Sequence, residues 1–166
     1  METIDRREQT GTTWAIRHGV IGGLVAGTIF LIAEMIGSVL LGGELLAPFQ
    51  AFASIPLGQM PPEIAIATAV PVGLITHAVL SVLYGVVFAF AVVSFPALHR
   101  STIMLLVAGT VYGILLWILN FFILPNVIGR PWFAMAPQVP QFVYHAIFWG
   151  TVLGAYFAAR RPAGTA

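Results

Sequence analysis

Charge is what this sequence has least of. Of its 166 residues only 8% are charged and 59% are hydrophobic, and it contains neither lysine nor cysteine. Soluble domains carry charge on about a quarter of their residues, so the composition indicates an integral membrane protein. The lack of cysteine excludes disulfides and thiolate metal ligands. A net charge of +1 offers no basic surface for nucleic acid, so none is expected as a partner.

Four apolar segments are long enough to cross a bilayer, which takes about 20 residues of helix. They span residues 18–41, 64–95, 102–124 and 141–159. We therefore predict an all-α fold in which residues 1–166 form one four-helix transmembrane domain with a cytoplasmic tail at 1–16. Pro71, near the start of the overlong second segment, predicts a kink or a short surface helix leading into the span.

Arginine placement predicts the orientation of the helices, because positive charge near helix ends is retained on the cytoplasmic side. Six of the seven arginines flank one side of the predicted membrane domain: Arg6, Arg7, Arg17, Arg100, Arg160 and Arg161. Only Arg130 falls on the other side. Both termini are thus predicted to be cytoplasmic. The connections 42–63 and 125–140, rich in proline and aromatic residues, are predicted to lie at the outer interface.

The chain contains a candidate internal repeat. VAGTIFLIAEMIGS (residues 25–38) aligns without a gap with VAGTVYGILLWILN (residues 107–120), and LITHAVL around His77 aligns with FVYHAIF around His145. The pattern predicts two tandem helical hairpins, at about 18–95 and 102–160. Because each hairpin crosses the membrane twice, a pseudo-two-fold axis along the membrane normal would relate the copies.

Glycines recur at helical spacing in the predicted helices. Small residues let membrane helices approach closely, as in GxxxG motifs. The predicted packing positions are Gly19, Gly23, Gly27, Gly109, Gly113, Gly150 and Gly154. At about 100° per residue, Glu34 shares a helix face with Gly27, and Asn120 shares one with Gly113. Both polar side chains are therefore predicted to face protein rather than lipid.

Each predicted helix places one polar side chain in the outer half of the membrane: Glu34, His77, Asn120 and His145. Ser81 extends this polar cluster by one turn. Burying an unpaired charge costs several kcal/mol, so an ionisable residue in a membrane is a functional-site hypothesis. His77 and His145 could ligate a b-type haem or contact a quinone, and with Glu34 they could bind a metal ion. A protonated Glu34 bonded to His77 or to a backbone carbonyl would instead form a structural latch.

The strings GTVYGILLWILNFFILP and VYHAIFWGTVLGAYFAAR combine GxxxG with Trp, Asn and a histidine-led last helix. In these features the chain resembles small uncharacterised bacterial four-helix inner-membrane proteins. The resemblance covers the third and fourth predicted helices best. It implies a bacterial cytoplasmic membrane and no particular activity.

No P-loop, Rossmann fingerprint, HExxH or GxSxG motif is present, and no catalytic residue is predicted. The protein is not expected to be an enzyme on its own. The leading hypothesis is a non-catalytic accessory or assembly subunit of a larger membrane complex, contacting the lipid bilayer and other membrane subunits or a second copy of itself. The alternatives are a haem-, metal- or quinone-binding redox protein, and a small proton-linked transporter or channel in which Glu34 titrates.

Overall fold

The fold is built entirely from helices. The computed structural model describes residues 2–160, and the part it describes contains no strand. In chain order the elements are α1 (Glu2–Leu40), α2 (Ala47–Leu57), the 3-10 helix η1 (Pro61–Glu63), α3 (Ile66–Ser94), the 3-10 helix η2 (Pro96–Arg100), α4 (Thr102–Ile118), the π-helix η3 (Leu119–Ile123), α5 (Leu124–Val127), the 3-10 helix η4 (Pro131–Met135), α6 (Gln138–Val143), the π-helix η5 (Tyr144–Thr151) and α7 (Val152–Ala158). The predicted all-α class is confirmed.

Within the described residues, three helices are long and apolar enough to cross a membrane: Gly11–Leu40, Ile66–Ser94 and Thr102–Val127. The fourth predicted segment is helical from α6 through α7 but is not one of these three. It carries Gln141 and His145 in its first half, and these side chains lower its hydropathy.

Two predicted features can be placed on the helices. The predicted tail at 1–16 is helical from Glu2 onward and forms the first turns of α1. Pro71 lies inside α3, in its second turn, and the helix runs on through it to Ser94. The short helices α2 and η1 precede α3, in the connection predicted to lie at the interface.

Glycine contacts join α1 to α3, and α4 to η5 and α7. A Cβ atom built on Gly23 would overlap the carbonyl oxygen of Ser81, and one built on Gly85 would lie 2.6 Å from the Cα of Gly23. On the other side, a Cβ on Gly109 would lie 2.8 Å from the Cα of Gly154. Real Cβ contacts are not this short, so only glycine permits these backbones to touch.

The two helix pairs, α1 with α3 and α4 with the η5–α7 segment, pack in different registers. The repeat alignment matches Gly27 with Gly109 and Val86 with Gly154. Gly27 nevertheless faces Ser81, whereas Gly109 faces Gly154. One local difference is that η5 is a π-helix, whose i→i+5 bonds accommodate an extra residue, while α3 is α-helical throughout. The two hairpins therefore differ in their contacts even where their sequences align.

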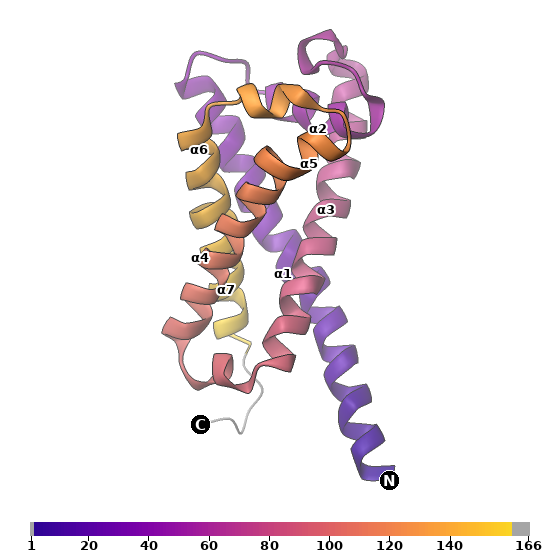
Figure 1. Ribbon diagram of the computed structural model, residues 1–166, viewed down its shortest axis with the longest axis vertical. Coiled ribbons are helices and arrows are strands. Elements are labelled where there is room, and N and C mark those ends of the chain that lie inside the picture. Colours follow the sequence, from indigo (N-terminus) through magenta and orange to yellow (C-terminus); the bar gives the residue numbers. More distant parts are fainter. Residues whose placement is uncertain (1, 161–166) are drawn as a thin grey trace.

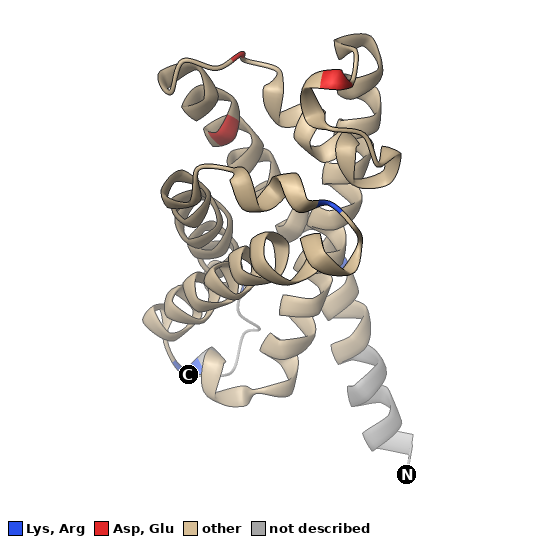
Figure 2. Cartoon of the chain, turned by 45° about the horizontal axis from the view of Figure 1, so that its top comes forward, with Lys and Arg blue, Asp and Glu red and all other residues tan. Residues whose placement is uncertain are grey.

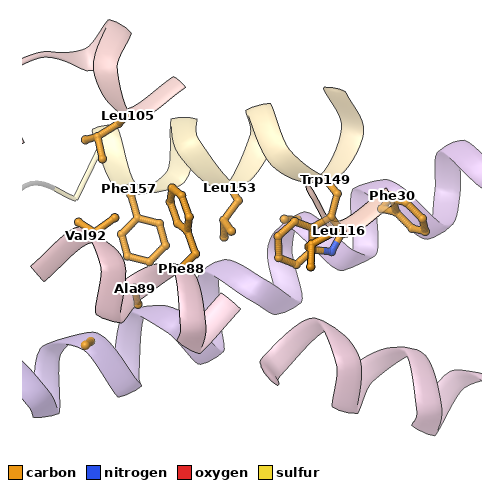
Figure 3. Packing of buried hydrophobic residues seen from close by; sticks show 11 residues of the cluster. Phe30, Phe88, Ala89, Val92, Leu105, Leu116, Trp149, Leu153 and Phe157 are labelled. Carbon is orange, nitrogen blue, oxygen red and sulfur yellow. The ribbon is translucent and has the colours of Figure 1, made fainter. Parts of the chain in front are cut away.

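The fold has two distinct ends. α1 begins and α7 ends at one of them, which we call the terminal end, whereas α2, α5 and η4 cover the other, which we call the capped end (Figure 1). Towards the terminal end the interior is filled by apolar side chains, including Phe88, Val92, Leu105, Leu153 and Phe157 (Figure 3). The capped end holds the polar residues singled out from the sequence.

Candidate functional site

A cavity of about 140 Å³ lies at the capped end, between α1, α2, α3 and the segment from η3 to η5. An engineered apolar cavity of about 150 Å³ binds benzene, so this space is large enough for one six-membered ring. Five of its lining residues are aromatic: Phe30, Phe52, Tyr84, Phe121 and Phe133. Four others are polar or ionisable: Glu34, Asn120, Gln141 and His145.

Glu34 is buried in this wall. It is 9% exposed, and its carboxyl group accepts a hydrogen bond from the side-chain amide of Gln141. Among the described residues that line the cavity, none is arginine or lysine. Glu34 therefore faces protein, as its position seven residues after Gly27 predicts, but its partner is an amide and not a cation.

His145, Asn120 and Tyr84 form a hydrogen-bonded chain along the cavity. The His145 Nδ1–H group donates to the carbonyl oxygen of Gln141 over 2.9 Å, because a carbonyl can only accept. In a neutral ring this leaves Nε2 as the acceptor, 3.4 Å from the Asn120 amide nitrogen. The Asn120 amide oxygen accepts from the Tyr84 hydroxyl over 2.8 Å, and the Tyr112 hydroxyl donates to the Tyr84 carbonyl over 3.0 Å.

His77 lies deeper, at the edge of a second cavity of about 40 Å³ that shares Tyr84, Asn120 and His145 with the first. Its Nε2–H donates to the carbonyl oxygen of Gly27 over 2.9 Å. The Ser81 hydroxyl oxygen lies 3.4 Å from the same nitrogen. The predicted latch between Glu34 and His77 is therefore not formed.

The residues predicted to hold haem or a metal do not fit either group in this arrangement. The Phe30 ring lies against both imidazoles, with its centroid 5.9 Å from that of His77 and 4.8 Å from that of His145. One ring nitrogen of each histidine is bonded to a backbone carbonyl. Within the described part of the chain, no three His, Asp or Glu side chains are grouped so that they could hold a metal ion. Glu34, His77 and His145 line one region without converging on one point.

The cavity borders a groove at the capped end. Ser38, Tyr144 and Pro140 line this groove, and three residues line both the groove and the cavity: Glu34, Ala51 and Gln141. The hydrogen-bonded pair of Glu34 and Gln141 thus lies at the boundary between the cavity and the groove at the capped end.

The opposite end of the cavity is closed by the apolar core. Leu116 and Trp149 line the second cavity, and both are at most 4% exposed. Figure 3 shows them beside Phe30, with Leu153 and Phe157 following along the same segment. The chain of polar contacts therefore leads inward from the groove and ends against packed apolar side chains.

Arg130 fixes one wall of the cavity. Its Nε–H group donates to the carbonyl oxygens of Ser54 and Ile55, over 3.2 and 3.1 Å, at the C-terminal end of α2. The Trp132 indole N–H donates to the Ser54 hydroxyl over 3.0 Å. The Ile55 carbonyl is among the last of α2, which have no partner within the helix, and the guanidinium supplies its donor. The Ser54 carbonyl already accepts from the Gly58 backbone N–H over 3.0 Å, and the guanidinium is its second donor. This contact ties the segment carrying Phe133 to α2.

Several site residues were missed by the sequence analysis. Gln141 stands one helical turn before His145, which is a signal that could have been used. Tyr84 stands two turns after His77. Phe52 and Phe133 gave no signal, because they belong to the two connections, and only the tertiary structure places those connections over the cavity.

No protein-family model, curated protein or solved structure matches this chain, so its function is inferred from the site itself.

Proposed function

We propose that this protein is a four-helix membrane protein that binds a small, mostly apolar molecule in the cavity at its capped end. The observation that carries the proposal is an aromatic-lined cavity with a buried carboxyl group, bordered by a groove on one side and by the apolar core on the other. Ligand sites are typically concave and apolar with a few placed polar groups.

We further propose that α6, η5 and α7 together form a fourth span and that the terminal end is cytoplasmic. The continuous helix from Gln138 to Ala158 has about the 30 Å length that a bilayer requires. Arg100 ends η2 and Arg160 follows α7 at the terminal end, whereas the acidic segments coloured red in Figure 2 lie towards the capped end. Glu2, Asp5 and Glu8 stand before the first span, but acidic residues contribute little to orientation. Arg161 lies outside the described residues, as do the side chains of Arg6 and Arg7. This orientation puts the cavity in the outer half of the membrane.

Single-cysteine labelling tests the orientation, since the chain has no native cysteine. Glu44 and Ala97 are both exposed and lie in connections at opposite ends. We expect Glu44→Cys to react with a membrane-impermeant maleimide in intact cells, and Ala97→Cys to react only after permeabilisation. The reverse labelling pattern would show that the terminal end faces outward and would overturn the proposed orientation.

The tandem duplication also remains a proposal. It is supported by the aligned strings and by the pairing of successive long helices, α1 with α3 and α4 with α7. The two copies would then have acquired different contact registers after the duplication, through local changes such as the π-helix η5.

The geometry favours a binding site over a channel. A through path for protons or ions needs polar groups or water along the whole span. Here the polar contacts lead from the capped end to Tyr84 and Tyr112, and buried Phe88, Leu153 and Phe157 fill the interior beyond them.

A second candidate function is the accessory subunit predicted from the sequence. It is favoured by a shallow apolar groove along α3, lined by Ala78, Val79, Val82, Leu83 and Val86. Lipid acyl chains would fill the same groove in a monomer. Polypeptides that co-purify with the parent but not with Val82→Trp would support this role, and an unchanged set of polypeptides would oppose it.

The ligand-binding proposal is tested with para-fluorobenzyl alcohol. Its affinity is measured by fluorine NMR on protein in nanodiscs of zwitterionic lipid. Ala51→Phe places a ring at the boundary of groove and cavity, and we expect it to weaken binding at least tenfold because the space is filled. Val79 is 60% exposed on α3 and does not line the cavity, so Val79→Phe is the matched control and should bind like the parent. Equal binding by all three proteins would show that the alcohol dissolves in lipid and would overturn the proposal.

A further inference from the structure

The cavity has more hydrogen-bond acceptors than donors to serve them. The Gln141 side chain donates to Glu34, but its own oxygen Oε1 is buried and has no hydrogen-bond partner among the described residues. Such an unpaired acceptor costs about 1–3 kcal/mol. The Glu34 carboxylate can accept about four hydrogen bonds, and the Gln141 amide supplies only part of that capacity. A molecule that fits this corner of the cavity must therefore donate hydrogen bonds.

The cavity also has a negative group without a positive one. Glu34 is its carboxyl group, and neither arginine nor lysine occurs among its described lining residues. His145, the only histidine in this lining, is bonded through Nδ1–H to a carbonyl and turns Nε2 to Asn120. It offers Glu34 no counter-ion. Arg130, on the nearby loop, directs its guanidinium to the end of α2 instead.

Aromatic rings supply most of the remaining wall. Phe30, Phe52 and Phe133 line the same cavity as Glu34, together with Phe121 and Tyr84. The face of an aromatic ring attracts cations within about 6 Å, with a strength that rises when water is excluded. A desolvated ammonium group beside a carboxylate and several rings is the combination by which proteins recognise organic cations.

We infer that the ligand is a small organic ammonium ion carrying one aromatic or compact aliphatic group. Its N–H groups donate to the Glu34 carboxylate and to Gln141 Oε1, and its apolar part lies among the phenylalanine rings. Glu34 and Gln141 border both groove and cavity, so the cation meets its charge partner on entry. This inference rests on the proposed ligand-binding function and names the chemistry of the ligand.

The test compares para-fluorobenzylammonium with para-fluorobenzyl alcohol, which has nearly the same shape but no charge. In the parent protein we expect the ammonium ion to bind at least tenfold more tightly than the alcohol. In Glu34→Gln the two affinities should become equal, because an amide keeps the shape but not the charge. Thermal unfolding of Glu34→Gln beside the parent shows independently whether the variant is folded.

The outcomes separate the two proposals. Equal binding of alcohol and ammonium by the parent would overturn the cation inference and leave the ligand site standing. It would also indicate that a protonated Glu34 serves Gln141 Oε1. A preference for ammonium that survives Glu34→Gln would likewise overturn the inference. If neither compound binds the parent, both the inference and the proposed function fail.

Discussion

Gly23→Leu is expected to separate α1 from α3 and to lower the free energy of unfolding by about 3 kcal/mol or more. A Cβ atom at this position would overlap the Ser81 carbonyl oxygen and lie 3.2 Å from the Cα of Gly85. Both atoms belong to backbone, so no side-chain rotation can relieve the clash. The two helices must move apart, and all the contacts along their shared face weaken together.

Gly11→Leu is the matched control for this substitution. Gly11 lies on the same helix, and nothing stands within 4 Å of a Cβ atom built on it. Leucine is also the better helix former by up to about 1 kcal/mol. Thermal unfolding in detergent should therefore show Gly11→Leu at or above the parent and Gly23→Leu far below it. Equal melting of all three proteins would mean that α1 and α3 do not touch at Gly23.

Glu34→Leu should lower the free energy of unfolding by about 1–3 kcal/mol, because it removes the hydrogen-bond partner of the Gln141 amide. Gln141 would then be left between a leucine and the aromatic cavity wall, with both ends of its amide unsatisfied. Glu34→Gln keeps a donor and an acceptor of nearly the same shape. We expect its stability to stay close to that of the parent.

A double mutant distinguishes this pairing from a general effect of the substitution. Glu34→Leu combined with Gln141→Leu removes both polar partners, so it should recover most of the stability lost in Glu34→Leu. Chemical unfolding of the four proteins gives the coupling free energy. Additive losses would refute the pairing, and a Glu34→Leu protein as stable as the parent would show that Glu34 and the Gln141 amide are served by water at the groove instead of by each other.

The sequence by itself determined the fold class and the helix face on which Glu34 lies. Hydropathy depends on composition over long windows, so the long spans are visible without any tertiary contact. Helical periodicity is similarly local. It placed Glu34 on the face of Gly27, and that side chain is buried against protein.

Only the tertiary structure decided which polar groups pair. Glu34 bonds Gln141 rather than His77, because the contact register of each helix pair depends on where the glycine backbones meet, and a shift of one turn exchanges every partner. The cavity wall shows the same dependence. Phe52 and Phe133 lie over Glu34 because α2 folds back against α3 and Arg130 ties the later connection to α2. The contacts of Arg130 with Ser54 and Ile55 join residues 75 or more positions apart, and no local pattern in a single sequence encodes a contact over that distance.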